Sequence, residues 1–191
     1  MTESNEIFNY LAVLFSIILG LAVTEVLQGF RHLLQARQRV VAYWPAIVWA
    51  FNLMVMCAQT WWAMFGLRNH TGWTFGMYGI VLIQTALLYL VAGLSLSGLD
   101  KESGYDMRRA YYDNARPFFL LIVAMLAASL VKDLILSGHL PGPLNVAFHG
   151  FFAVIGLVAA ATRNEIYHKI NAPFAAIGLA AYVVVLFDRI S

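Results

Sequence analysis

The sequence predicts an all-α integral membrane protein, a bundle of six transmembrane helices in a single domain over residues 1–191. Hydrophobic side chains make up 61% of the 191 residues and charged side chains 12%, against about 45–50% and about 25% in an ordinary soluble domain. The apolar residues also gather into six runs close to the ~20 residues that a helix needs to cross a bilayer. This composition excludes a soluble enzyme, a disordered chain and a nucleic-acid binder.

The six spans follow one another along the chain. The first carries one charge, Glu25, and follows an acidic N-terminus unlike that of a signal peptide, so we expect it to be retained. The second and third carry no charge, and the fourth holds Lys132 and Asp133 near its end. Pro117 and Pro173 are expected in the first turns of the fourth and sixth helices, where a missing N–H costs little. The expected spans are 7–30, 44–67, 73–99, 117–136, 143–162 and 172–190.

The basic residues predict the orientation. Nine of the 12 Lys and Arg residues fall in the three loops that share one side of the predicted bundle: Arg31, Arg37, Arg39, Lys101, Arg108, Arg109, Arg116, Arg163 and Lys169. Cytoplasmic loops carry an excess of Lys and Arg. We therefore expect a multi-pass protein with these loops in the cytoplasm and both termini on the non-cytoplasmic side.

Polar residues within the spans are the candidate functional residues, because an ionisable group in lipid is costly. They form a possible ion or polar path: Glu25, Gln28, Asn52, Gln59, Gln84, Lys132, Asp133 and His149. The alternative is structural, since neutral polar side chains often hydrogen-bond across helices for about 1 kcal/mol or less. Lys132 and Asp133 are adjacent and point about 100° apart, so each is expected to pair elsewhere or to reach the interface.

Histidines are the first candidates for a cofactor. His149 is the one histidine expected well inside a span, whereas His168 is expected near a helix end. Glu165 and His168 have the E-x-x-H spacing of di-iron bundles, but those proteins use two such pairs. We therefore expect no metal site and no catalytic residues, and the cofactor is left open.

Small residues recur at four-residue spacing, which lets helices approach closely. The helix-packing candidates are Ser16, Gly20, Thr24, Gly93, Gly156 and Ala160. Their neighbours belong either to this chain or to another one.

Three stretches carry a resemblance. They are 8–22 with Phe8-Asn9-Tyr10-Leu11, 61–75 with Trp61-Trp62, and 132–141 with Lys132-Asp133. Together they resemble a group of small bacterial polytopic inner-membrane proteins that have no assigned function. The resemblance implies the inner membrane of a bacterium and no particular substrate or active site.

Three functions remain open from the sequence. The first is a non-catalytic assembly or accessory subunit of a membrane complex or homo-oligomer, with the lipid bilayer, a second copy or a larger complex as partner and no nucleic acid. The second is a small oligomeric channel or transporter that uses Glu25, Lys132 and Asp133. The third is a membrane enzyme or cofactor carrier around His149.

Overall fold

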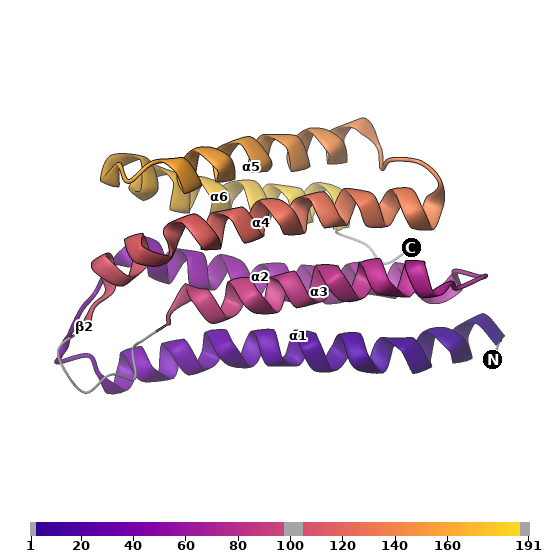
Figure 1. Cartoon of the computed structure of the whole chain (residues 1–191), viewed down its shortest axis with the longest axis horizontal. Helices are drawn as coiled ribbons and strands as arrows, with labels where there is room; N and C mark the ends of the chain where they lie inside the picture. Colours follow the sequence, from indigo (N-terminus) through magenta and orange to yellow (C-terminus); the bar gives the residue numbers. More distant parts are fainter. Residues whose placement is uncertain (1–2, 98–104, 188–191) are drawn as a thin grey trace.

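Six long helices form one bundle in the computed structural model, which describes residues 3–97 and 105–187 (Figure 1). Each of the six is long and apolar enough to cross a membrane, which confirms the predicted six-helix fold. The helices are α1 (Glu3–Gln35), α2 (Trp44–Phe65), α3 (Phe75–Ser95), α4 (Met107–Ser137), α5 (Pro143–Ala161) and α6 (Glu165–Phe187). A 3₁₀ turn, η1 (Gly66–Asn69), follows α2, and two-residue strands β1 (Val40–Val41) and β2 (Tyr105–Asp106) pair in parallel.

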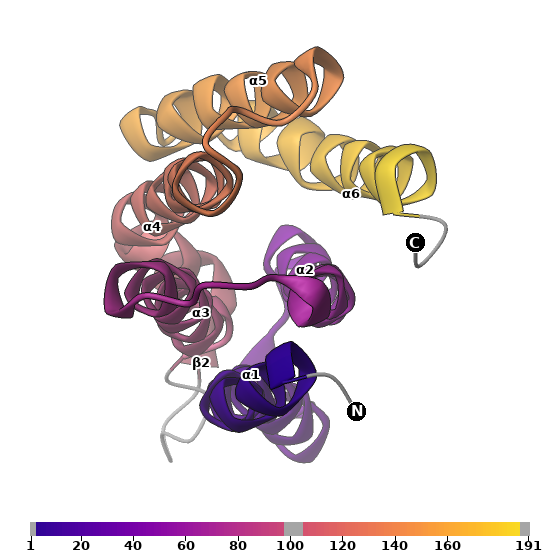
Figure 2. The same ribbon diagram turned by 90° about the vertical axis from the view of Figure 1, so that its right-hand side faces the viewer.

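The helices pack in a closed ring in the order α1, α3, α4, α5, α6, α2 (Figure 2). Most of the large, fully buried side chains come from the first four helices, among them Phe15 of α1, Leu53 of α2, Leu88 of α3 and Phe119 of α4. The last two helices complete the ring, since α5 packs on α4 and α6 returns to α2. Helices distant in sequence, α2 and α6, therefore lie side by side.

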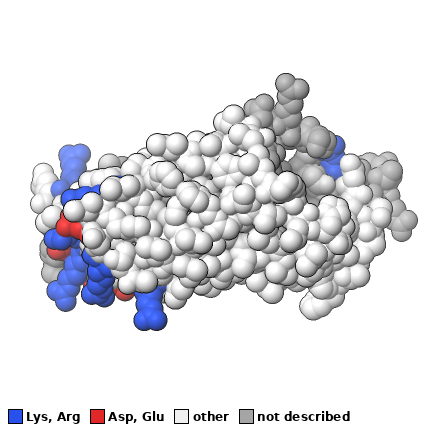
Figure 3. Space-filling view, turned by 90° about the horizontal axis from the view of Figure 1, so that it is seen from above, with Lys and Arg blue, Asp and Glu red and all other residues white. Residues whose placement is uncertain are grey.

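The two ends of the bundle differ in charge. At the basic end α1, α3 and α5 finish and α2, α4 and α6 begin, and most of the visible Lys and Arg residues gather there, at the left of Figure 3. The opposite, terminal end holds the start of α1 and the last turns of α6 (Figure 1). Lys101, one of the nine basic residues assigned to the three loops, lies outside the described residues.

Helix α4 begins ten residues before its predicted start. The carboxylate of Asp106 accepts the backbone N–H groups of Arg108 (2.9 Å) and Arg109 (3.2 Å) and caps the helix at Met107. Pro117 therefore lies inside the helix, and the prediction that it marks the first turn is wrong. The cap satisfies N–H groups that a helix start leaves free, so the helix extends beyond the apolar run.

Helix α6 also begins early, and for the same reason. The side-chain oxygen of Asn164 accepts the N–H groups of Ile166 (2.9 Å) and Tyr167 (3.3 Å), so the helix starts at Glu165 and Pro173 lies inside it. The prediction of a start at 172 is wrong. The predicted ends of the third and sixth spans, at 99 and 190, lie outside the described residues.

The small residues fall into two groups. A Cβ on Gly156 would lie 3.0 Å from a methyl carbon of Val123, so this glycine lets α5 approach α4, and Ala160 packs beside the core. Gly20 and Gly93 have open space around them. Ser16 and Thr24 bond to their own helix, and Gly20 and Thr24 are exposed on the surface of the bundle. The crowded glycine of α1 is instead Gly29, where a Cβ would lie 2.6 Å from the Cβ of Leu96.

Candidate functional site

An elongated cavity of about 410 Å³ lies among α2, α3, α4, α5 and α6. Along α2 it extends from Trp49 to Leu67, just beyond the helix end, a length of roughly 25 Å at the usual helical rise. Near the basic end it stops at Trp49, Phe119 and Asn171, and it reaches Lys132 and Asp133 near the terminal end. Pockets of this size hold drug-sized ligands. Helix α1 does not line it.

The middle of the cavity is apolar. Its walls include Met56 of α2, Ile122 and Met125 of α4, Phe152 of α5 and Leu179 of α6. Methionine side chains are flexible and adapt to the shape of a neighbour. The polar side chains of this middle part are Gln59 and Thr60 of α2, Gln84 of α3 and Ser129 of α4. The middle therefore suits an apolar body with few polar groups.

Ionisable and polar side chains meet where the cavity reaches the terminal end. We call Lys132, Asp133, Asn145, His149 and Tyr182 the charged mouth. Lys132 Nζ lies 3.4 Å from Asp133 Oδ1, with 16% and 28% of the two side chains exposed. The two residues therefore pair with each other, and the prediction that they would not is wrong. His149 lines the cavity together with this pair, and its ring lies 5.8 Å from that of Tyr182.

Hydrogen bonding fixes the tautomer of His149. Its Nδ1–H donates to the carbonyl oxygen of Asn145, one turn earlier, over 2.9 Å. In the neutral ring Nε2 is then the acceptor. The carboxylate of Asp133, the ammonium of Lys132 and the imidazole thus provide an acceptor, a donor and a group able to take up a proton, all on the lining of one cavity.

Two buried asparagines lie at the opposite, deep end. We call Asn52 and Asn171 the deep amides; they are 5% and 4% exposed and both line the cavity. Asn52 Nδ2 donates to the carbonyl oxygen of Ala172 over 3.4 Å, which joins α2 to α6. Neither polar side-chain atom of Asn171 has a hydrogen-bond partner. An unpaired buried amide costs about 1–3 kcal/mol, so this position is unusual unless something in the cavity binds it.

A tyrosine–histidine layer, formed by Tyr43, Tyr111, Tyr112 and His168, lies between the deep end and the basic end. The hydroxyl of Tyr111 donates to His168 Nδ1 (2.9 Å), and His168 Nε2–H donates to the carbonyl oxygen of Thr162 (3.0 Å). The hydroxyls of Tyr43 and Tyr112 lie 3.0 Å apart. Burial, together with this contact, raises the pKa of the Tyr43 phenol above its usual value. The layer separates the cavity from the basic end.

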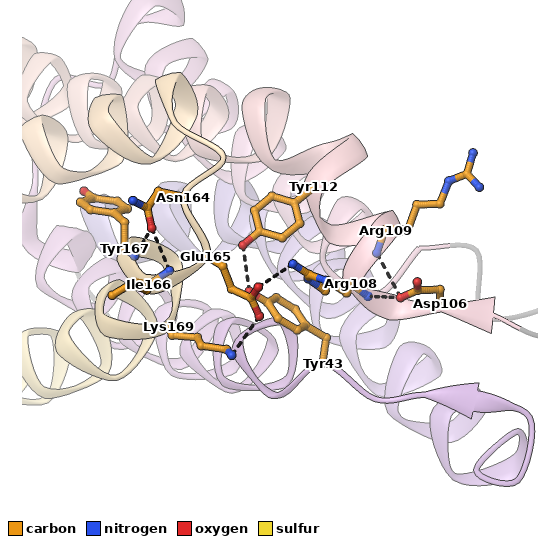
Figure 4. Close-up of polar contacts among 10 residues, drawn as sticks. All are labelled: Tyr43, Asp106, Arg108, Arg109, Tyr112, Asn164, Glu165, Ile166, Tyr167 and Lys169. Atoms are coloured by element: carbon orange, nitrogen blue, oxygen red, sulfur yellow. Dashed lines mark hydrogen bonds and ion pairs between the residues drawn. The ribbon is translucent and has the colours of Figure 1, made fainter.

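Ion pairs lie beside this layer at the basic end (Figure 4). Glu165, at the start of α6, binds Arg108 of α4 and, over 2.9 Å, Lys169 one turn later. His168 lies in the first turn of α6, near a helix end as predicted, and its side chain is fully buried. Glu165 and His168 bind different partners: Arg108 and Lys169 for the carboxylate, Tyr111 and the carbonyl of Thr162 for the imidazole. No group of three or more metal-ligating side chains occurs in 3–97 and 105–187.

The structure gathers most of the predicted polar path in one place. Six of its eight residues line the cavity: Asn52, Gln59, Gln84, Lys132, Asp133 and His149. Glu25 and Gln28 do not, because they lie on α1. Glu25 makes no ion pair with any described residue.

Sequence reasoning missed the contribution of α6. Asn171, Ala175, Leu179 and Tyr182 all line the cavity. They are spaced by four, four and three residues, which is one face of a helix. The signal was present, but a sixth helix that starts at 172 leaves Asn171 outside it.

No protein family, curated protein or solved structure matches this chain. The function therefore has to be inferred from the chemistry of the cavity. That chemistry consists of an ion pair and a histidine at one end, an apolar middle and two amides at the other end.

Proposed function

We propose that this protein is a small membrane carrier that binds an amphipathic molecule in its intramembrane cavity. The observation that carries the proposal is the cavity itself, about 410 Å³ with an ion pair at one end and apolar walls beyond it. A charged or zwitterionic head group would bind Lys132, Asp133 and His149, and the apolar body would lie against Met56, Met125 and their neighbours. Of the functions expected from the sequence, this corresponds to the channel or transporter alternative. Glu25 has no part in the proposal, because it does not line the cavity.

The cost of charges in lipid supports a functional role for the ion pair. Ionisable residues within spans are rare and usually mark substrate or ion pathways. Lys132 and Asp133 are mostly buried, and a purely structural helix end would not need them on the wall of a cavity.

The one-sided shape of the cavity supports a carrier over an open pore. The cavity reaches the terminal end, and the tyrosine–histidine layer separates it from the basic end. Carriers expose a site near the bilayer midplane to one side at a time. For passage across the membrane, the layer would have to open while the charged mouth closes.

The test uses protein purified from its native membranes in a mild detergent. Bound molecules are extracted and identified by mass spectrometry, and uptake is measured in proteoliposomes. We expect a stoichiometric amphipath in the wild type, lost in Asp133→Asn and retained in Glu25→Gln, because Glu25 lies on α1 outside the cavity. The two variants make the same chemical change in a predicted span, so they are matched controls. Equal retention in both, or no enrichment over bulk lipid, would refute the proposal.

We further propose that the basic end faces the cytoplasm of a bacterium and that the protein lies in the inner membrane. The support is the charge asymmetry of the bundle. Cys57 is the only cysteine and is 2% exposed, so an added cysteine can be labelled selectively. With a membrane-impermeant maleimide on intact cells, Asn69→Cys should react and Gln38→Cys should not. If Gln38→Cys reacted and Asn69→Cys did not, the protein would have the opposite orientation in the membrane.

The assembly role expected from the sequence stays a prediction. Gly20 and Thr24 lie exposed on α1 and are open to a neighbour in the membrane. The mass of the intact assembly, measured by native mass spectrometry after gentle extraction, tests it. A stoichiometric partner would favour an accessory subunit, and a solitary monomer would refute that role.

A further inference from the structure

We propose that the deep amides Asn52 and Asn171 form a second binding subsite, which takes a neutral hydrogen-bonding group at the far end of the bound molecule. The inference rests on the proposed carrier function and narrows its substrate class. The substrate would be a two-ended molecule, with a charged head at the charged mouth and a hydroxyl, carbonyl or amide group at the deep end.

The unpartnered amide of Asn171 is the first observation. This side chain is 4% exposed, it lines the cavity, and neither its Nδ2 nor its Oδ1 has a partner. The great majority of buried polar groups in proteins are hydrogen-bonded. Its neighbours on the same face of α6, Ala175 and Leu179, are apolar and also line the cavity. An apolar residue at 171 would complete that wall, so the amide is explained by a group that enters the cavity.

The position of Asn52 is the second observation. It faces the same deep end from α2, and its 3.4 Å hydrogen bond to the carbonyl of Ala172 uses one N–H of its amide. The oxygen and the second N–H are not used by that bond. Two amides from two helices therefore offer both donors and acceptors to one group.

The absence of charge at the deep end sets the type of that group. Among the described residues, Lys132 and Asp133 are the charged side chains that line the cavity, and both belong to the charged mouth. A carboxylate or ammonium at the deep end would lose its water without gaining a counter-charge, which is unfavourable. A hydroxyl, carbonyl or amide pairs with an asparagine without that loss.

The distance between the two subsites sets the length of the molecule. From Tyr182 at the charged mouth to Asn171 there are 11 residues of α6, or about 16 Å. A saturated chain of twelve carbons spans about 14 Å when extended, from C–C bonds of roughly 1.5 Å. A simple fatty acid would fill the apolar middle but would bring only a methyl group to Asn171.

The experiment compares dodecanoate with 12-hydroxydodecanoate, which differ only in the terminal hydroxyl. Their affinities for the purified full-length protein in lipid nanodiscs are measured by calorimetry. We expect the hydroxylated probe to bind the wild type about tenfold more tightly, which is about 1.4 kcal/mol. In Asn171→Leu the preference should disappear, because the deep partner is gone.

A matched variant separates recognition from folding. Asn114 is an amide of α4 that does not line the cavity and donates to Ser97 Oγ (3.2 Å) and to the carbonyl of Ala110 (3.1 Å). Asn114→Leu should lower the melting temperature and keep the tenfold preference. Asn171→Leu should raise the melting temperature of the ligand-free protein, since it removes an unpartnered amide.

The outcomes distinguish the two proposals. If the wild type binds both probes equally, the amphipath site stands and the deep subsite is refuted, with water as the partner of Asn171. If the wild type binds neither probe, the proposed function fails and this inference fails with it. If Asn114→Leu also loses the preference, the effect is structural and the deep subsite is refuted.

Discussion

The ion pair of the charged mouth allows its structural and functional roles to be separated with three variants. Lys132→Met and Asp133→Leu each leave one charge unpaired, and the double variant removes both. Unit charges 3.4 Å apart attract by about 5 kcal/mol at an effective dielectric constant of about 20 and by about 1 kcal/mol in water. With 16% and 28% of the side chains exposed, the pair lies between these limits, and we expect a coupling energy of about 2 kcal/mol.

Thermal unfolding of the purified protein, followed by the fluorescence of its five tryptophans, measures this coupling. For a chain of this size 1 kcal/mol corresponds to about 2–4 °C. With a double variant close to the wild type, a coupling of this size corresponds to about 1 kcal/mol for each single variant. Each single variant should therefore melt about 2–4 °C below the wild type. The double variant should recover most of this loss, because replacing a buried pair by apolar groups is often neutral or stabilising.

Ligand binding should not recover in the double variant, since the head group loses both of its charged partners. A double variant that is stable and still binds would refute the role assigned to the charged mouth. A coupling energy near zero would refute the pairing itself.

Three further predictions concern the packing of the bundle and the tyrosine–histidine layer. Tyr111→Phe removes the hydroxyl bound to His168 and should cost about 1–3 kcal/mol in the free energy of unfolding, because a buried acceptor loses its donor. Gly156→Leu should lower the melting temperature, since its Cβ would lie 3.0 Å from an α4 side chain, whereas Gly20→Ala has open space and should change little. The raised pKa of Tyr43 means that the folded state holds the phenol proton more tightly than the unfolded state does. The stabilising contribution of the protonated phenol is therefore complete below about pH 10 and is lost as the pH rises above it. Tyr43→Phe should flatten that alkaline decline, measured as melting temperature against pH.

Each of these has a result that would contradict it. An unchanged stability of Tyr111→Phe would mean that water or another donor serves His168. Equal effects at Gly156 and Gly20 would show that the approach of α5 to α4 is not tight. The same alkaline slope in Tyr43→Phe and the wild type would assign the decline to other groups.

The sequence predicted the six helices correctly because their apolar runs are long and almost free of charge. It placed the starts of α4 and α6 too late, because hydropathy detects the lipid-facing part of a helix and not its polar first turns. The caps Asp106 and Asn164 set those starts, and they act on backbone N–H groups that hydropathy does not register.

The sequence identified the polar residues of the cavity one by one, because polar groups are costly in lipid. It did not predict which of them lie together. Whether Glu25 and Asp133 share a site depends on which helices are neighbours, and the ring order follows no rule of chain order. The pairing of Lys132 with Asp133 was missed because the 100° between adjacent residues describes Cβ directions. A long lysine side chain can bend back toward its neighbour.

The ring order also bears on how the protein is made. Five of the six helices can enter the membrane before the last one is synthesised, yet α6 supplies Asn171, Leu179 and Tyr182 to the cavity and closes the ring on α2. Domains emerge and fold from the N-terminus during synthesis. A nascent chain with five helices would therefore expose the polar face of α2 and the ion pair of α4 to lipid until α6 arrives. The binding site would be the last part of the bundle to form, and a chain that stops early would lack it.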